Sequence, residues 1–463
     1  MSLLRGACPT LAAPMETGDG LLARMHPVSG GVTPATLAAI AEAARRFGNG
    51  LLEVTARGSL QIRGLTGDSA PRFAAAVDAL DISVRSGVPV ETGPLAGLDP
   101  EEIIDPRPLA DDIRERVAAV GLSQRLGPKV SVVVDGGGRL KLVALVADVR
   151  LEAAATDGAW RVAVGGTAST ATVLGVVPAA DVATTVVTLL ETVAAKGRRA
   201  RAKELSLEEL RSTLPPSVLP DISPSRGEIG RPLGFRQSSI VRNAPASKLP
   251  ISPLVGEMSG RTEGGNVEQS PIGIFPLSDA RLALGIGLPF GQATATQIIG
   301  FAERAERHGV DEIRLAPGRA LLALAPVAEA AVRLKEMASF IGFITDPADP
   351  RLSVVACAGA PACASGHIQA RAIASEIAAD AAAILGRGQL LHVSGCAKQC
   401  ARPDRAAFTL VGTASGAELY SGDGTAGEPL ARVANDAAAD AFRRAGEFHR
   451  QEKNKRDKAA AAR

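Results

Sequence analysis

Apolar and polar residues follow two different periods along this chain, and one arrangement of them occurs twice. The stretch "GLLARMHPVSGGVTPATLAAIAEAARRFGNGLLEVTARGSLQI" (20–62) aligns without gaps to "RLALGIGLPFGQATATQIIGFAERAERHGVDEIRLAPGRALLA" (281–323). In each copy, short apolar runs flank a segment whose apolar residues recur every three or four positions, which is the period of a half-buried helix. Each copy therefore predicts strand, helix, strand.

The helix of the first copy has recognisable ends. Thr33 is a good N-cap, Pro34 suits the first helical position, and Gly48 supplies the stop. Its predicted apolar stripe consists of Leu37, Ile40, Ala41, Ala44 and Phe47. Because a unit this small cannot bury its sheet alone, we expect the two copies to pack about a pseudo-two-fold axis with a ligand between them.

Further strands and helices follow each copy. After the first, "KVSVVVDGGGRLKLVALVADVRL" predicts a hairpin around 136–138, followed by a strand in "AWRVAVGG" and a helix near 179–196. After the second, "RLSVVAC" and "LLHVSGC" predict strands that each deliver a cysteine, with a helix in "ASGHIQARAIASEIAADAAAIL" between them. The cysteines thus belong to the last domain.

Composition and charge narrow the class of protein. A chain of 463 residues with 46% hydrophobic content is long enough for roughly three domains. The net charge of +2 disfavours bulk attraction to nucleic acid or to a membrane surface. No apolar run approaches the roughly 18 residues of a membrane span, and the N-terminus lacks a signal-peptide pattern, so we expect a cytoplasmic protein.

The segment 216–265 interrupts the two halves. Of its residues 22 are Pro, Gly or Ser, and no period persists. That composition is typical of an exposed, poorly ordered loop. The segment also resembles the translation of a mobile palindromic DNA element, so we interpret it as a passenger.

Four of the five cysteines form two close pairs, C-x5-C and C-x3-C, in loops rich in Gly, Ala and Ser. In a reducing compartment, paired cysteines are more often metal ligands than disulfides. The loose spacing favours a four-iron four-sulfur cluster over a zinc knuckle, although zinc remains the alternative and buried packing a weaker one. The four residues are Cys357, Cys363, Cys396 and Cys400.

The two copies differ in charge. Arg24, His26 and Arg57 of the first copy stand where the second has glycine, and the second adds Arg314 and Arg319. Several arginines on one sheet face suggest a polyanionic ligand, because a guanidinium pairs with a carboxylate at two points. Taken singly, each of these arginines is more readily a solvated strand residue; for the set, the two interpretations are about equal.

These features together resemble the sulfite and nitrite reductase family. The stretches "RGACPTLAAPMETGDGLLAR", "LPFGQ", "RLAPGR" and "HVSGCAKQCARP" resemble in particular its precorrin-3B synthase branch, which works in aerobic cobalamin biosynthesis. The resemblance covers nearly the whole chain apart from the insert and the C-terminal tail.

The resemblance implies an α+β fold with two ferredoxin-like half-domains that pair about a pseudo-two-fold axis. Two α/β domains of the nitrite and sulfite reductase type accompany them, and the last carries the cluster. The expected parts are a first half-domain (1–75), a first α/β domain (76–212), a linker with the insert (213–270), a second half-domain (271–345), the iron-sulfur α/β domain (346–448) and a tail (449–463).

The resemblance also implies roles for particular residues. The four cysteines would ligate a 4Fe-4S cluster, and the position of Cys400 bridges to siroheme iron in the reductases. Those reductases line an anion pocket at the positions of His26, Arg57, Lys129 and Ser131. Only Arg57 and Lys129 keep a permanent cation here, which disfavours sulfite or nitrite reduction. A cradle for a tetrapyrrole remains, with Arg24, His26, Arg57, Lys129, Arg314 and Arg319 as candidate substrate-binding residues.

The implied reaction is oxidation of precorrin-3A by molecular oxygen, with hydroxylation at C20 and γ-lactone formation. The implied cofactors are the 4Fe-4S cluster and a mononuclear non-haem iron, for which no 2-His-1-carboxylate spacing stands out. No G-x-G-x-x-G occurs at a strand-to-helix turn, so NADH electrons should arrive through a separate reductase. The alternatives are a siroheme-dependent sulfite or nitrite reductase and a non-catalytic iron-sulfur electron carrier.

Overall fold

The structure is a computed structural model that describes residues 9–27, 31–154, 158–212, 270–386, 388–401, 406–422, 425 and 427–461. The insert predicted at 216–265 lies outside the described residues. No helix in the described ranges is long and apolar enough to cross a membrane.

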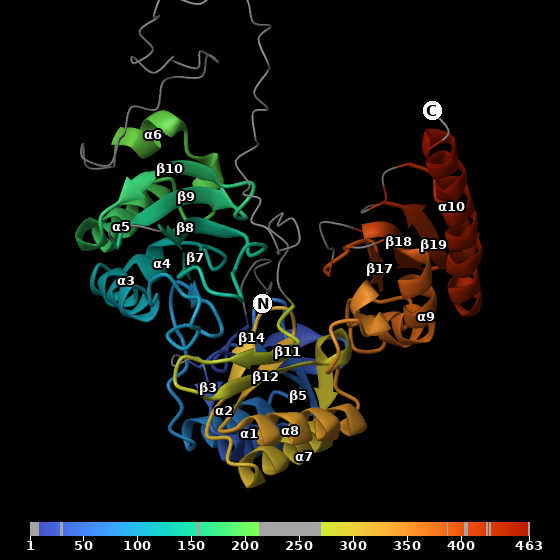
Figure 1. Ribbon diagram of the computed structural model, residues 1–463, viewed down its shortest axis with the longest axis horizontal. Coiled ribbons are helices and arrows are strands. Elements are labelled where there is room, and N and C mark those ends of the chain that lie inside the picture. Colours follow the sequence, from blue (N-terminus) through green and yellow to red (C-terminus); the bar gives the residue numbers. More distant parts are fainter. Residues whose placement is uncertain are drawn as a thin grey trace, which may run out of the picture.

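Two five-stranded antiparallel sheets form the lower part of the molecule in Figure 1. The first sheet has the order β1-β2-β5-β4-β13, and the second has the order β11-β12-β15-β14-β3. The strands of the first sheet are β1 (Met15–Thr17), β2 (Gly20–Met25), β5 (Leu60–Leu65), β4 (Leu51–Val54) and β13 (Gln292–Thr294). Those of the second are β11 (Gly273–Pro276), β12 (Leu282–Gly287), β15 (Ala320–Ala325), β14 (Ile313–Ala316) and β3 (Gly31–Val32).

Each of these sheets is completed by a strand from the other half of the chain. β13 pairs with β4, where Gln292 lies opposite Glu53, and β3 pairs with β14, where Gly31 lies opposite Arg314. β3 and β13 occupy matching positions in the two copies of the repeat. The exchange is therefore reciprocal, and it confirms the predicted pairing of the copies about a pseudo-two-fold axis.

The helices of the two copies pack against each other. These are α1 (Pro34–Phe47) and α7 (Ala295–Arg307), and α2 (Ser69–Asp78) and α8 (Ala328–Ile341) flank them. The predicted cap of α1 is confirmed, since the Thr33 side chain accepts a bond from the Thr36 N–H. The corresponding Thr294 forms a full capping box with Gln297.

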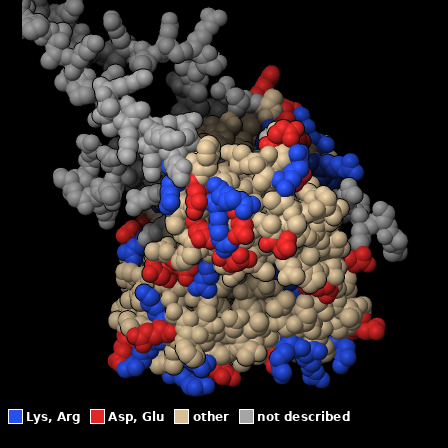
Figure 2. Space-filling model, turned by 90° about the vertical axis from the view of Figure 1, so that its right-hand side faces the viewer, with Lys and Arg blue, Asp and Glu red and all other residues tan. Residues whose placement is uncertain are grey.

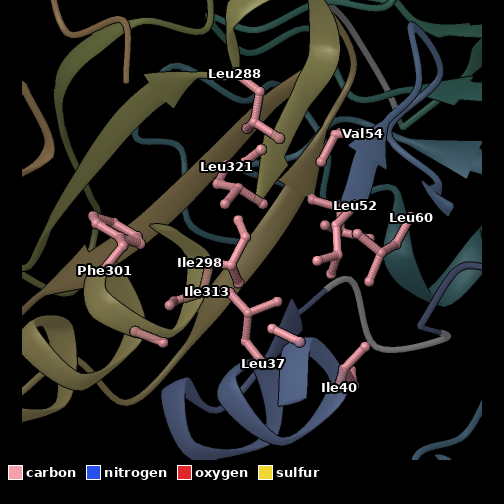
Figure 3. Packing of buried hydrophobic residues seen from close by; sticks show 14 of the residues in the cluster. Leu37, Ile40, Leu52, Val54, Leu60, Leu288, Ile298, Phe301, Ile313 and Leu321 are labelled. Atoms are coloured by element: carbon pink, nitrogen blue, oxygen red, sulfur yellow. The ribbon is translucent and has the colours of Figure 1, made fainter. Parts of the chain in front are cut away.

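One hydrophobic core joins the two copies. Side chains from α1, β4 and β5 meet side chains from α7, β14 and β15 in it (Figure 3). Of the predicted stripe, Leu37, Ile40, Ala41 and Ala44 are buried. Phe47 is only half-buried, and the guanidinium groups of Arg46 and Arg72 cover its ring.

The third sheet, of order β10-β9-β8-β7-β6, belongs to the first α/β domain. β6 (Val90–Thr92), β7 (Val132–Asp135) and β8 (Ala147–Ala153) are parallel, whereas β9 (Trp160–Gly166) and β10 (Thr172–Val177) are antiparallel to their neighbours. Its helices are α3 (Arg107–Ala119), α4 (Leu122–Arg125), α5 (Ala179–Ala195) and α6 (Leu207–Ser212).

The hairpin predicted around 136–138 is wrong. β7 and β8 are parallel neighbours, so the chain that connects them must run back to the edge of the sheet where β7 begins. The connection is held by the Asp135 carboxylate, which accepts bonds from Gly137 N and Leu142 N, each at 2.9 Å. Leu140 and Leu142 are buried in it. The glycines begin this longer connection and do not form a tight turn.

The fourth sheet carries the cysteines and repeats the plan of the third. Its order is β16-β17-β18-β19-β20, and again the first three strands are parallel and the last two antiparallel. The strands are β16 (Val354–Ala356), β17 (Leu390–Ser394), β18 (Ala406–Thr413), β19 (Gly416–Ser421) and β20 (Ala431–Val433). α9 (Ala370–Ile384) links β16 to β17, and α10 (Ala438–Ala461) lies along the outside (Figure 1).

Candidate functional site

The four cysteines lie in two loops at one edge of the fourth sheet. β16 and β17 are parallel, so their carboxyl ends lie at the same edge. Cys357 directly follows β16, Cys396 follows β17 after one glycine, and Cys363 and Cys400 lie further along the same loops. All four are free thiols. The predicted delivery of Cys357 and Cys396 by two strands is confirmed.

Glycines let these two loops come into contact. The Gly395 N–H donates a hydrogen bond to the Cys357 Sγ at 3.0 Å. A Cβ on Gly395 would lie 2.8 Å from the Cα of Gly359, which itself has a φ of +64°. Larger side chains at either position would separate the two cysteine pairs.

The thiols are near enough to influence one another electrostatically. Burial raises the pKa of the Cys400 thiol, and Cys396, Cys357 and Cys363 raise it further, while Lys398 acts in the opposite direction. If all four thiols ionise, a bound metal or cluster would relieve their mutual repulsion.

Four thiols in two neighbouring loops, with a backbone N–H directed at one sulfur, are a donor set that suits an iron-sulfur cluster. Within the described ranges no three His, Cys, Asp or Glu side chains are arranged to hold a single metal ion.

The first sheet contacts the loop of Cys363 through buried charges. Arg63 donates to Asp19 Oδ1 at 2.8 Å, lies 3.5 Å from Glu53 Oε2, and donates to the carbonyl of Ala362. Glu53 also pairs with Arg371 of α9 at 2.6 Å. We call Asp19, Glu53, Arg63 and Arg371 the buried ion-pair network; it joins the N-terminal half of the chain to the cysteine domain.

The turn that carries Asp19 touches the same loop. A Cβ on Gly18 would lie 2.4 Å from Ala364 N and 2.5 Å from Cys363 C, so only glycine fits there without displacing the loop. Sequence reasoning missed this network. The available signal was a polar residue at every second position of β5, Gln61 and Arg63, opposite Glu53 in β4.

Two of the predicted substrate-binding residues lie beside this network. With its amide oxygen turned toward Arg24, Gln61 accepts bonds from Arg24 Nε at 3.0 Å and Nη2 at 2.6 Å, and it donates to Glu53 at 3.1 Å. Burial lowers the pKa of Arg319, and Arg371 lowers it further while Glu53 opposes both. Arg24 and Arg319 are thus on the side of the first sheet that faces the cysteine domain.

Three other predicted residues, His26, Arg57 and Arg314, line a pocket of about 240 Å³ between the second sheet and the first α/β domain. We call it the arginine pocket, because three arginines that the sequence did not single out complete it. These three, Arg85, Arg107 and Arg114, lie in helical and loop segments without a distinctive sequence pattern. Its cationic or titratable basic side chains are His26, Arg57, Arg85, Arg107, Arg114 and Arg314.

Carboxylates and carbonyls hold these arginines in place. Arg85 pairs with Glu91 and Arg114 with Asp111, each at 2.5 Å. Arg314 pairs with Glu312 at 2.8 Å and donates to the carbonyls of Pro94 and Ala96 at 3.3 and 3.2 Å. Arg57 donates to the carbonyl of Val146. Arg107 pairs with Asp105 at 2.8 Å, so four of the five arginines each have a carboxylate partner, and Arg57 is held by a carbonyl.

His26 contributes no charge to the arginine pocket near neutral pH. Burial lowers the pKa of its imidazole to about 4, and the neighbouring Arg85 contributes to this. Nδ1 lies 3.0 Å from the carbonyl oxygen of Pro27.

Lys129 is exposed and does not line the arginine pocket. Ser131, two residues further along, is buried, and within the described residues its Oγ has no hydrogen-bond partner. The six predicted residues therefore divide into His26, Arg57 and Arg314 in the pocket, Arg24 and Arg319 at the network, and Lys129 alone.

Comparison with known proteins identifies the family. Residues 13–80 match the family described as the nitrite/sulfite reductase ferredoxin-like half domain. A precorrin-3B synthase from Sinorhizobium sp is 36% identical over 455 residues, which is 98% of this chain and 90% of the relative. The chain belongs to the precorrin-3B synthase branch of the nitrite and sulfite reductase family.

Members of the wider family are more distant from this precorrin-3B synthase branch. A ferredoxin–nitrite reductase from Synechococcus elongatus is 26% identical over 419 residues, 86% of this chain and 77% of that one. The structure of the Mycobacterium tuberculosis NirA protein has a TM-score of 0.63 at 18% identity, and the match covers 91% of this chain and 79% of that one. The predicted fold class, with paired ferredoxin-like half-domains and two α/β domains, is confirmed.

Proposed function

We propose that this protein is a precorrin-3B synthase that oxidises precorrin-3A with molecular oxygen, hydroxylating C20 and closing a γ-lactone from the ring A acetate. The identity of 36% over almost the full length of a precorrin-3B synthase is the observation that carries the proposal. The electrons come from NADH through a separate reductase.

In this proposal Cys357, Cys363, Cys396 and Cys400 would hold a 4Fe-4S cluster, while the described residues assign no ligands to a mononuclear non-haem iron. The cluster supplies electrons one at a time, which amino-acid side chains do not do. The residues of this chain position it: Gly395 donates to Cys357, and Arg63 donates to the carbonyl that precedes Cys363.

The arginine pocket supports a carboxylate-rich substrate. Its volume of about 240 Å³ is below the roughly 300–1,000 Å³ of pockets that enclose a drug-sized ligand. A tetrapyrrole ring cannot be enclosed there, whereas an acetate or propionate arm can enter. Arg57 and Arg314 bind such an arm by charge-assisted hydrogen bonds, and His26 lies beside them as a neutral imidazole.

Substitution of Arg57 tests this placement. Arg57→Ala should weaken precorrin-3A binding by roughly 1.5–3 kcal/mol, because a charged hydrogen bond is lost, and the visible spectrum of the cluster should stay unchanged. Arg57→Lys should restore binding only in part, since an ammonium group lacks the guanidinium fork. Arg45→Ala is the control, since Arg45 forms an exposed ion pair with Glu42 on α1. If Arg57→Ala leaves precorrin-3A turnover unchanged, the proposed activity stands but the proposed binding site is wrong.

The second candidate is a siroheme-dependent nitrite or sulfite reductase, favoured by the 26% identity to a ferredoxin–nitrite reductase. Oxygen-dependent conversion of precorrin-3A by the reduced protein should be measured in parallel with nitrite and sulfite reduction. Bound siroheme in the anaerobically purified protein, together with nitrite or sulfite turnover and no precorrin turnover, would establish the reductase instead. A protein with a cluster but without tetrapyrrole binding would point to an electron carrier.

A further inference from the structure

Lys398 connects the two cysteine loops. It lies between Cys396 and Cys400 in the second loop, and its Nζ donates a hydrogen bond to Ser365 Oγ at 2.7 Å. Ser365 follows Cys363 by two residues in the first loop. The bond thus closes the loops on each other across the side of Cys400, the exposed member of the four thiols.

A cation held in this position acts on whatever the thiols hold. The four thiolates bring four negative charges, and each electron added to a cluster makes the site more negative still. A fixed positive charge therefore stabilises the reduced form more than the oxidised form. Lys398 is exposed, so solvent screens part of its charge, but the bond to Ser365 restrains its ammonium group between the two cysteine loops.

We propose that Lys398 is a positioning residue for the cluster that joins the two cysteine loops through Ser365 and sets the reduction potential with its charge. The inference rests on the proposed function only in requiring that the four cysteines hold a redox-active cluster. It does not depend on the identity of the substrate.

The reduction midpoint potential of the anaerobically purified protein tests the inference. It is measured from the visible absorption during a dye-mediated redox titration. Lys398→Met should shift the midpoint to a more negative value. At a fixed potential, the ratio of reduced to oxidised protein should fall by up to about tenfold, which is about 59 mV for one electron. Lys398→Arg, which keeps the charge, should stay close to the unaltered protein.

Two further variants separate the effect of the Lys398 charge from the effect of its hydrogen bond to Ser365. Ser365→Ala keeps the ammonium but releases it, so a smaller shift in the same direction is expected. Lys203→Met removes an exposed lysine of the first α/β domain and should not move the midpoint. Ser365→Ala decides the matter if Lys398→Met does not retain iron, because it leaves every charge in the protein in place.

The outcomes distinguish failure of this inference from failure of the proposed function. Full iron and acid-labile sulfide with an unchanged midpoint in both Lys398→Met and Ser365→Ala would overturn the role of Lys398 and leave the cluster assignment intact. Absence of iron and sulfide from the unaltered protein after anaerobic purification would instead show that the four cysteines hold no cluster. This inference would then fail together with the cluster assignment.

Discussion

At the scale of single residues, the candidate site depends on a few side chains whose neighbours leave little freedom. Gly18 and Gly395 lie where any side chain would collide with the opposing backbone. Arg63 is buried between two carboxylates and a loop carbonyl. The cysteines and the arginines of the repeat could be singled out from the sequence because their types are chemically distinctive. Gly18 and Arg63 could not, because their importance arises from contacts with residues far along the chain, 299 positions away for Arg63.

Serine substitution of the cysteines is expected to remove the cluster. Cys396→Ser or Cys400→Ser replaces a thiolate with a hydroxyl group, which is a poor iron ligand, so iron, acid-labile sulfide and broad visible absorption should all fall. Cys8→Ser, outside the paired cysteines, should keep them. Full iron and sulfide content in Cys396→Ser and Cys400→Ser would show that these thiols do not hold a cluster.

His26 should make the protein sensitive to mild acid. The pKa of its imidazole is about 4 in the folded state against 6.5 in the unfolded state, so between these values the unfolded chain binds more protons. The free energy of unfolding should therefore decrease as the pH falls from 6.5 to 4, by at most about 3 kcal/mol for this group. In His26→Gln, denaturant titrations at a series of pH values should give a flatter profile over this window. Parallel profiles for the two proteins would contradict the pKa shift.

At the scale of elements, local sequence decided some features and tertiary contacts decided others. The cap of α1 follows from Thr33 and Pro34, and strands that end at Cys357 and Cys396 follow from apolar runs. The sequence did not predict that β8 runs parallel to β7, because the glycines at 136–138 are equally compatible with a hairpin and with a longer connection. The exchange of β3 and β13 was likewise invisible, since each strand has only two or three residues.

The caps of the two paired helices offer a matched comparison. Thr294 accepts from Gln297 N while the Gln297 side chain accepts from Thr294 N, whereas Thr33 accepts from Thr36 N without a reciprocal carboxamide. Thr294→Ala should lower the free energy of unfolding by about 1 kcal/mol, and Thr33→Ala by less. Chemical denaturation of the two variants under identical conditions measures the difference. A larger loss for Thr33→Ala would contradict the ranking.

At the scale of the whole molecule, the chain consists of two halves with the same plan. The third and fourth sheets share strand order and directions although their sequences did not reveal it. Gly93 follows β6 where Cys357 follows β16, so only one half has the cysteine site. The interfaces differ as well: apolar residues such as Leu95, Leu322 and Leu324 join the second sheet to the first α/β domain, and the buried ion-pair network joins the first sheet to the cysteine domain.

The face of the molecule drawn in Figure 2 agrees with the small net charge of the chain. On the face drawn in Figure 2, Lys and Arg side chains are interspersed with Asp and Glu, and no large field of one sign is visible. Arg443 of α10 illustrates this, since it pairs with Glu376, Asp380 and Asp440. Five arginines gather in the arginine pocket, where four of them are paired with carboxylates.

Removal of the insert tests its interpretation as a passenger. A protein in which 216–265 is replaced by a short Gly/Ser linker should keep solubility, iron content and precorrin turnover, because the length of a connection changes the free energy of folding little. Size-exclusion chromatography, iron analysis and the oxygen-dependent assay measure these properties. Loss of folding in the shortened protein would show that the segment is structural.

The reciprocal exchange of β3 and β13 makes the two ferredoxin-like half-domains mutually dependent. If either half were synthesised alone, β4 or β14 would become an edge strand whose free N–H and C=O groups invite pairing with another chain. A lone half would satisfy that edge most readily with a second copy of itself, since β3 and β13 come from corresponding positions. The arrangement thus has the form of a strand-swapped homodimer joined in one polypeptide, in which the two halves can differ, as they do in their paired cysteines.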